Sequence, residues 1–190
     1  AQGVADNSVQ VEADNFGSLI RPDVTDVYNM LRILESKNVS GHLFLSHTHQ
    51  KVLQALWQAD YLSPKYHVVI ANPPYMGSKG MNGQLTTWTK KKYQHCWDRG
   101  TSDLYAMFID RAVRMTLQNG ATAMITMQGW MFTSSFELLR SCLLADNSLS
   151  SVIHLGTRAF DSIAGHVVST VAFVFQAKSD KGQQGYFLRL

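Results

Sequence analysis

The feature that most constrains the fold is a short apolar run that stops at two consecutive prolines. In the segment YHVVIANPPY, residues 68–71 are all apolar, and Asn72-Pro73-Pro74-Tyr75 follows directly. A short apolar run without polar alternation is typical of a strand buried on both faces, as in a parallel sheet. Asn and Pro are turn residues, so the strand is expected to end there. The run therefore predicts an α/β sheet with this tetrapeptide at the carboxyl end of one strand.

Hydrophobic periodicity and turn residues predict the other elements. Helices are expected at residues 24–38, 47–60, 102–118 and 134–145. Strands are expected at residues 121–127, 151–155 and 167–175, with another strand-like run at 185–190. Asn119-Gly120 is expected to stop the third helix, and a capping box from Ser134 to Glu137 is expected to open the fourth. The alternation of strands and helices favours a layered α/β sheet that ends in an antiparallel strand pair.

Composition excludes several classes of protein. With 45% apolar and 16% charged residues, the chain is not a disordered one, and it has no apolar run of about 18 residues that could span a membrane. Two cysteines, Cys96 and Cys142, are too few for a disulfide framework and favour a reducing intracellular setting. The net charge of +3 does not by itself indicate an acidic partner. Because the chain starts at Ala1 and stops inside a strand-like run, we expect it to be part of a longer polypeptide.

The tetrapeptide Asn72-Pro73-Pro74-Tyr75 can be interpreted as a turn or as a site. As a site it is well placed, since ligands of α/β sheets bind beyond the carboxyl ends of the strands. The amino group of an aromatic base is a poor nucleophile because its lone pair is delocalised into the ring. An Asn oxygen and a backbone carbonyl that accept its two N–H bonds would free that lone pair for attack. Prolines hold such carbonyls in place, and an adjacent aromatic ring can stack on the base.

Together with three companion segments, the tetrapeptide resembles the amino-group DNA methyltransferases of the adenine-N6 type. The companions are residues 13–16 (ADNF), 103–108 (DLYAMF) and 154–160 (HLGTRAF), which follow the order of the family's motifs. The resemblance implies a truncated Rossmann-like, S-adenosylmethionine-dependent methyltransferase sheet. It assigns catalysis to Asn72, Pro73, Pro74 and Tyr75. It also places Tyr75 and Phe160 against a flipped adenine, and it assigns cofactor contacts to Asp14, Phe16 and Phe108.

Longer strings narrow the resemblance. The segments VVIANPPYMGSKGMN and AMITMQGWMFTSSFELLR are similar to the large methyltransferase of the BREX phage-defence system and to type IIG restriction–modification enzymes. This implies site-specific adenine-N6 methylation of double-stranded DNA, with S-adenosylmethionine as cofactor. Other subunits of the defence system are candidate partners, and the bacterial cytoplasm, with no membrane association, is the expected location. One departure is His166, where the family pattern has an acidic residue.

A larger departure concerns the cofactor. The family's glycine-rich cofactor loop should precede Asp14, and no such segment lies in the chain. Residues 1–190 are therefore expected to form only part of the catalytic domain, with residues 24–60 as a helical insertion and the target-recognition domain outside the chain. We expect the isolated fragment to bind cofactor weakly and to methylate little or nothing.

Residues 77–101 form a long polar segment that is predicted to be a loop. Its basic residues outnumber its one acidic residue, Asp98, by five to one, which gives a local charge of +4. These basic residues are Lys79, Lys90, Lys91, Lys92 and Arg99, with Trp88, Tyr93 and Trp97 among them. Basic and aromatic residues together suit phosphate contact with base stacking, so DNA contact is predicted here in preference to a solvated loop.

Other functions stay open on the sequence alone. The chain could be a non-catalytic DNA-binding module, or it could methylate protein glutamine or cytosine N4. No metal site is predicted, because His42, His47 and His49 lack a partnered cysteine or carboxylate cluster. Trp130 and Phe132 follow a strand end and could line the site, although packing is the stronger interpretation for both.

Overall fold

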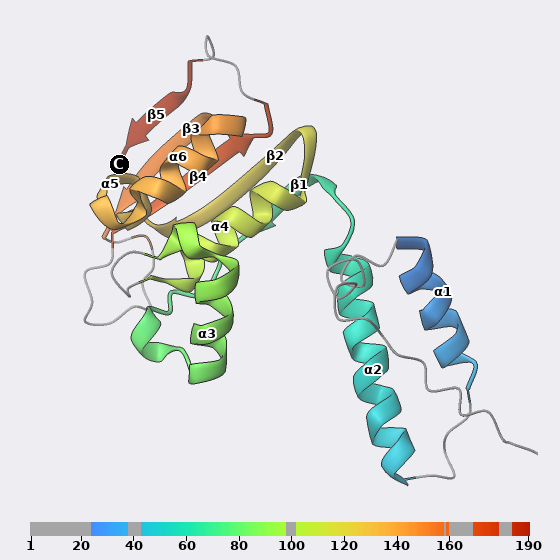
Figure 1. Cartoon of the computed structure of the whole chain (residues 1–190). Coiled ribbons are helices and arrows are strands. Elements are labelled where there is room, and N and C mark those ends of the chain that lie inside the picture. Colours follow the sequence, from blue (N-terminus) through green and yellow to red (C-terminus); the bar gives the residue numbers. More distant parts are fainter. Residues whose placement is uncertain (1–23, 38–42, 98–101, 158, 160–168, 179–183) are drawn as a thin grey trace, which may run out of the picture. The chain divides into compact units, whose positions relative to one another are not determined.

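The structure is a computed structural model that describes residues 24–37, 43–97, 102–157, 159, 169–178 and 184–190 (Figure 1). Its contacts divide the chain into two compact units, one ending at Pro64 and the other starting at Lys65. The second unit contains both the sheet and the candidate site.

The first unit contains two packed helices, α1 (Val24–Glu35) and α2 (Leu43–Leu62). Val27 and Leu31, one turn apart on α1, are buried, as expected for the apolar stripe of an amphipathic helix. The His49 ring also donates a hydrogen bond of 2.7 Å to the Leu34 carbonyl oxygen, which ties α2 to the end of α1. Both helices predicted in this region are confirmed. Neither they nor the other helices in the described ranges are long and apolar enough to cross a membrane.

The second unit is built on a five-stranded mixed sheet in the order β1-β2-β4-β3-β5. β1 pairs with β2 in parallel and β3 with β5 in parallel, while β4 lies antiparallel between β2 and β3. β1, β2 and β3 therefore run in one direction and end at the same edge. The predicted α/β sheet with its antiparallel pair is confirmed. The strands are β1 (Tyr66–Ala71), β2 (Thr116–Met127), β3 (Ser148–Gly156), β4 (Thr170–Gln176) and β5 (Tyr186–Arg189).

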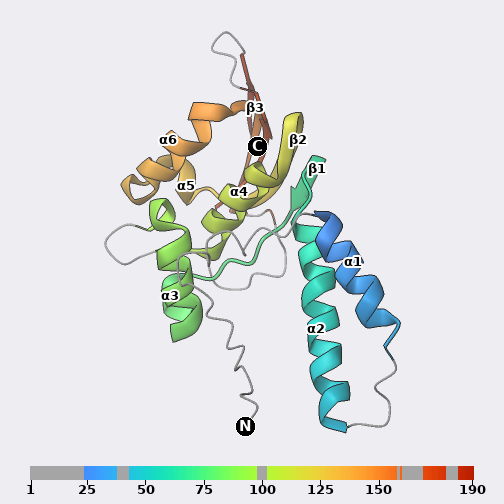
Figure 2. The same ribbon diagram turned by 45° about the vertical axis from the view of Figure 1, so that its right-hand side comes forward.

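Three helices cover one face of this sheet: α4 (Leu104–Met115), the short α5 (Gly129–Phe132) and α6 (Glu137–Asp146). In Figure 2 the sheet is seen nearly edge-on, and all three helices lie on the same side of it. The core between these layers is partly aromatic. The Trp130 ring centroid lies 4.9 Å from that of Phe173 and 5.8 Å from that of Phe175, and all three side chains are buried. Trp130 is thus a core residue, as its stronger interpretation predicted.

The helix predicted at residues 102–118 ends earlier in the structure than expected. α4 stops at Met115, and β2 begins at Thr116. Asn119-Gly120 makes a turn, as its type indicates, but the turn lies within β2. Asn119 adopts a left-handed φ of 65° there, and the register of β2 against β1 shifts at this point. The turn is held by two backbone hydrogen bonds to Ala177 of about 3 Å.

Two further local predictions are wrong. Residues 77–101 are not a structureless loop, because they contain α3 (Gly83–Lys92) and the 3-10 turns η2 (Ser78–Gly80) and η3 (Gln94–Cys96). The Asn82 side chain caps α3 by accepting a 2.8 Å hydrogen bond from the Leu85 amide. The capping box is not formed either. A 3-10 turn, η4 (Ser134–Phe136), precedes α6, whose N-terminus has no side-chain cap.

The close approach around Gly120 leads to a stability prediction. A Cβ at Gly120 would lie 2.5 Å from the His67 carbonyl oxygen and 2.9 Å from that of Leu117, whereas a Cβ at Gly83 would meet open space. We therefore expect Gly120→Ala to lower the free energy of unfolding by about 1–3 kcal/mol, because backbone must move. Gly83→Ala is the matched control and should change it by less than about 1 kcal/mol. Denaturant titration followed by circular dichroism measures both, and equal effects would contradict the close packing.

Candidate functional site

Asn72 is exposed and directly follows β1, at the edge where β1, β2 and β3 end. It also borders an open apolar groove of about 390 Å³, lined among others by Ile70, Ile125 and Ile153. This groove belongs to the face opposite the helices, because Ile70 exposes 76% of its surface while its strand neighbours Val69 and Ala71 pack against the core. The next residue, Pro73, is buried. The tetrapeptide thus presents an exposed amide side chain next to a buried proline.

Tyr75 is half-buried and is held through both its ring and its hydroxyl. Its ring meets the Tyr105 ring edge-on, with centroids 6.2 Å apart. Its hydroxyl donates a long hydrogen bond of 3.5 Å to the Ile125 carbonyl oxygen on β2. Burial raises the pKa of the Tyr75 phenol, and the nearby Asp103 carboxylate raises it further. Tyr75 is therefore a neutral phenol at physiological pH, suited to aromatic contact rather than to proton removal.

Tyr105 supports Tyr75 from within the core. It is 3% exposed, and its ring also packs against Phe136 at 5.9 Å. Burial raises its pKa strongly and Asp103 raises it further, while a backbone hydrogen bond from Trp130 opposes the shift. A Cβ on Gly129 would come within 3.2 Å of the Tyr105 hydroxyl, so glycine lets α5 approach this ring closely. No role was predicted for Tyr105 from the sequence.

Asp103 joins the segment after Tyr75 to the start of α4. As the N-cap of α4, its carboxylate accepts a 3.3 Å hydrogen bond from the Tyr105 amide, and it also accepts one of 3.0 Å from the Met76 amide. Burial raises the pKa of Asp103, and hydrogen bonds from the backbone amides of Tyr105, Met76 and Leu104 oppose that rise. The sequence contains a signal for the cap, since Asp directly before an apolar helix is typical of an N-cap. It contains no signal for the bond to Met76.

Of the three predicted cofactor residues, only Phe108 lies within the described residues; Asp14 and Phe16 lie outside them. Phe108 exposes 42% of its surface on α4, whereas Tyr105, Ile109 and Ala112 form the buried stripe of that helix. The Phe108 ring therefore lies outside the core. An exposed ring of this kind fits a group with a flat adenine, such as S-adenosylmethionine.

Phe160, the second predicted base-contacting residue, lies outside the described residues, between the end of β3 and the start of β4. The ends of those strands are joined by a polar cluster that no sequence pattern predicted. His154 Nε2 is hydrogen-bonded to Gln128 Oε1 and lies 3.2 Å from Ser169 Oγ, and the Gln128 amide donates to the Ser169 carbonyl at 3.0 Å. Phe132, at the end of α5, exposes 68% of its surface and is not a core residue.

The predicted DNA-contacting lysines are all exposed where they are described. Lys79 lies in η2, and Lys90, Lys91 and Lys92 form the last turn of α3; Arg99 lies outside the described residues. Cations at a helix C-terminus are favoured by the helix dipole. Of the three aromatic residues, only Trp88 is well exposed, at 55%. Tyr93 is buried, and Lys90 Nζ lies 5.2 Å from the Trp97 ring centroid. Stacking by Tyr93 is therefore excluded by its burial.

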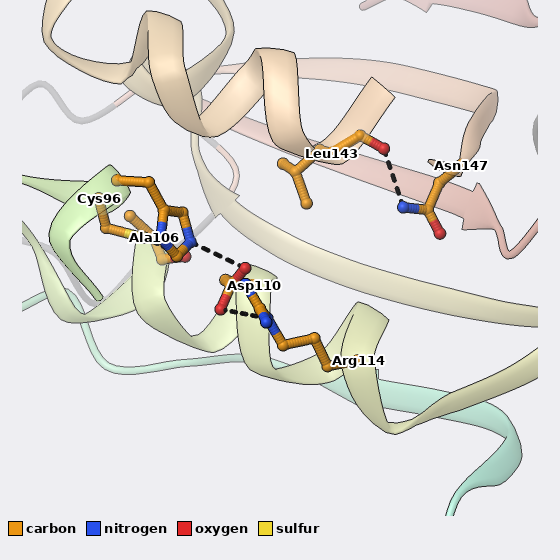
Figure 3. A network of polar contacts seen from close by, with 7 residues as sticks. Cys96, Ala106, Asp110, Arg114, Leu143 and Asn147 are labelled. Atoms are coloured by element: carbon orange, nitrogen blue, oxygen red, sulfur yellow. Dashed lines mark hydrogen bonds and ion pairs between the residues drawn. The ribbon is translucent and has the colours of Figure 1, made fainter. Parts of the chain in front are cut away.

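The segment that follows α3 is anchored to α4 by a buried carboxylate. Asp110, which is 4% exposed, lies 2.9 Å from His95 Nε2. It also lies 2.9 Å from Arg114 Nε, one turn later on α4 (Figure 3). Next to His95, the Cys96 side chain is fully buried, and its thiol donates to the Ala106 carbonyl at 3.8 Å. Among the described residues, no three His, Cys, Asp or Glu side chains gather as metal ligands would. The contact of His95 with Asp110 is therefore a structural one, between η3 and α4.

Comparison with known proteins gives a family match and several relatives. The model of the family described as "Eco57I restriction-modification methylase" matches residues 24–160. The adenine-specific methyltransferase BrxX of Escherichia coli O9:H4 (strain HS) is 38% identical over 181 residues, which are 94% of this chain and 15% of that protein. The adenine-specific methyltransferase PglX of Lacticaseibacillus casei (strain Zhang) is 43% identical over 129 residues, which are 68% of this chain and 10% of that protein. The chain thus spans about one seventh or less of these relatives.

Two solved structures share the fold. One is described as a class I S-adenosylmethionine-dependent methyltransferase from Listeria monocytogenes. It has a TM-score of 0.51 and 18% identity over 67% of this chain and 37% of that one. The other is the type IIL restriction–modification enzyme MmeI in complex with DNA, with a TM-score of 0.52 and 16% identity over 63% of this chain and 16% of that one. The sheet therefore has the S-adenosylmethionine-dependent methyltransferase fold.

The two cysteines are expected to differ in reactivity. Burial, with a smaller contribution from Asp110, raises the pKa of the Cys96 thiol from 9.0 to about 12, so it stays protonated at pH 8. Cys142 is exposed on α6. Because the thiolate is the reactive form, iodoacetamide at pH 8 should label Cys142 readily and Cys96 only after unfolding. Peptide-level mass spectrometry measures both sites, and rapid labelling of Cys96 in the folded chain would contradict the packing of η3 against α4.

Proposed function

Because the chain belongs to the Eco57I restriction-modification methylase family, we propose that it is part of the catalytic domain of a DNA adenine-N6 methyltransferase. The enzyme would act site-specifically on double-stranded DNA in the cytoplasm of a bacterium, within a phage-defence or restriction–modification system. The observation that carries the proposal is the exposure of Asn72 at the carboxyl end of β1, with Pro73 buried behind it. The names of the two relatives, both adenine-specific methyltransferases, support the choice of adenine.

Asn72 would act on the nucleophile. Its side-chain oxygen and a backbone carbonyl of the tetrapeptide accept the two N–H bonds of the adenine amino group. This leaves the nitrogen lone pair free to attack, because it is no longer fully delocalised into the ring. Pro73 and Pro74 keep the carbonyls in place because their φ angles are fixed. Catalysis then rests on positioning and electrostatics, and no covalent enzyme intermediate is needed.

The target adenine would be flipped out of the duplex and held between aromatic rings. Tyr75 offers one ring, which Tyr105 and the Ile125 carbonyl hold in position. Phe160 is proposed to offer the other. Phe132 is exposed on the same edge of the sheet and is available for a further apolar contact.

S-adenosylmethionine, when bound, supplies an electrophilic methyl group on sulfur. That methyl group would pass from the sulfur to the adenine nitrogen that Asn72 positions, and the nitrogen would release one proton to solvent. Phe108 would hold the cofactor by packing its exposed ring against the cofactor's adenine. Asp14 and Phe16 are proposed to complete the contact, with the Asp14 carboxylate accepting from the cofactor's adenine amine.

DNA would be held by the basic surface of α3. Lys90, Lys91 and Lys92 place three positive charges on its last turn, with Lys79 in the preceding η2 turn. Arg99 is proposed to extend this contact, and the exposed Trp88 ring can contact bases or sugars. The same surface would also serve a non-catalytic DNA-binding module, which is therefore the second candidate function. Action on protein glutamine or on cytosine N4 has no support from a described residue.

The proposal predicts that Asn72→Ala strongly slows methylation by the full-length parent. Loss of one well-placed polar group in a transition-state site typically lowers kcat about 10²- to 10³-fold. Transfer of tritiated methyl from S-adenosylmethionine to DNA measures the rate. Asn147→Ala is the matched control, because the Asn147 side chain hydrogen-bonds only the Leu143 carbonyl at the end of α6 among the described residues. If the parent leaves no methyl mark that Asn72→Ala removes, methylation is not its function, and DNA binding becomes the conclusion.

A second prediction concerns the basic surface. Changing Lys90, Lys91 and Lys92 to Gln should weaken DNA binding and reduce the salt dependence of log K by about 0.9 for each phosphate that is no longer neutralised. Fluorescence anisotropy of labelled duplex at several salt concentrations measures both quantities. The control removes the same charge from three exposed lysines elsewhere, Lys51, Lys65 and Lys178. If both triple variants reduce the slope equally, α3 is not a specific contact surface.

A further inference from the structure

We propose that Asp103 is a positioning residue for methyl transfer: its carboxylate fixes the backbone that directly follows the Asn72–Tyr75 tetrapeptide. The proposal rests on the proposed function, since it says how the catalytic segment is held in place. Asp103 itself is not expected to touch the substrate.

The tetrapeptide has few backbone hydrogen bonds with which to hold its own shape. Pro73 and Pro74 have no N–H, so the first backbone donors after Asn72 are those of Tyr75 and Met76. The Met76 amide donates to Asp103 Oδ1 at 3.0 Å. Of the first two backbone N–H groups after Asn72, the one of Met76 is thus bonded to a single oxygen of the Asp103 carboxylate.

The same oxygen also belongs to a rigid element. Asp103 Oδ1 accepts from the Tyr105 amide at 3.3 Å inside the first turn of α4, and Tyr105 is buried against Tyr75 and Phe136. An ordinary N-cap needs only the bond into its own helix. Asp103 makes a second bond, to a segment 27 positions earlier in the chain, and this bond serves the tetrapeptide rather than the helix.

Backbone hydrogen bonds hold the segment after the tetrapeptide next to the start of α4, within reach of the Asp103 carboxylate. The Leu104 amide donates to the Met76 carbonyl at 3.0 Å, and the Ser78 amide donates to the Ser102 carbonyl at 2.8 Å. The Met76 amide therefore donates to Asp103, and the Met76 carbonyl accepts from Leu104, both at the start of α4. Loss of the Asp103 side chain would leave the accepting bond in place and free the donor, so Met76 and the tetrapeptide before it could rotate without detaching.

The test uses four variants of the full-length parent. Asp103→Ala removes both carboxylate bonds. Asp103→Asn keeps an Oδ1 that can accept from both amides. Asp103→Ser keeps a cap for Tyr105 but is too short to reach Met76, and it also serves if the alanine variant fails to fold. Asn147→Ala removes one side-chain bond at the end of a different helix, from a residue outside the catalytic and binding groups.

We expect Asp103→Ala and Asp103→Ser to lower kcat about 10- to 100-fold, since small misplacements at a reacting centre cost that much. KM for DNA and for S-adenosylmethionine should change less than about 3-fold, because neither Asp103 nor Met76 is among the residues proposed to contact them. Asp103→Asn and Asn147→Ala should keep kcat within about 3-fold of the parent. Normal kcat for Asp103→Ser, or loss of kcat in Asp103→Asn equal to that in Asp103→Ala, would overturn the proposal. The second result would mean that the negative charge takes part in the chemistry.

A second readout does not depend on activity. Hydrogen–deuterium exchange of a peptide that contains Met76 should be faster in Asp103→Ala and Asp103→Ser than in the parent, and unchanged in Asp103→Asn. If the parent transfers no methyl group, the proposed function fails, while this exchange pattern still tests the tether. If the parent is active and exchange is unchanged in all variants, the positioning role is wrong and the proposed function stands.

Discussion

The parallel pairing of β1 with β2 is the constraint on which the candidate site depends. The register from Val68 opposite Ala121 to Ala71 opposite Met124 ends one residue before Asn72. Because proline cannot donate to a ladder, Pro73 and Pro74 prevent the pairing from continuing and turn the chain out at a defined residue. β2 continues to Met127 at the same edge, where Gln128 and α5 follow. The edge thus carries both the tetrapeptide and the start of α5, and the backbone pairing of β1 with β2 positions them.

Aromatic packing connects this edge to the core. Tyr75 contacts Tyr105, Tyr105 contacts Phe136, and Trp130 of the adjoining α5 packs on Phe173 in β4. Rings of this size dominate core energetics and prefer edge-on contacts. The contact of Tyr75 with Tyr105 therefore ties the tetrapeptide to the packed core between the helices and the sheet. The opposite face of the sheet differs. Val68 and Ile70 expose 58% and 76% of their surface there, so the prediction that this apolar run is buried on both faces is wrong.

Much of this arrangement could be predicted from sequence, because it follows from local patterns. The apolar run before Asn72 predicted β1, and helical spacing predicted α1, α2 and α4. The failures have physical causes. Asn119-Gly120 was expected to stop the third helix, but the pairing of β2 with β1 and the bonds to Ala177 place it inside a strand. α3 was missed because its sequence is polar and rich in lysine, without an apolar stripe. Tyr105 and the cluster of His154, Gln128 and Ser169 are set by tertiary contacts with no spacing rule.

The two ends of the basic segment, at Gly77 and Asp103, are joined to each other. Gly77 and Asp103 form an isolated bridge, and the Ser78 amide bonds the Ser102 carbonyl. Farther along, His95 holds the segment to Asp110 of α4. α3 lies between these two anchors, so both sides of the helix that carries Lys90, Lys91 and Lys92 are tied to α4. α4 begins at Asp103, the residue that also holds Met76. One residue thus belongs at once to the start of α4, to the end of the tetrapeptide and to the base of the basic segment.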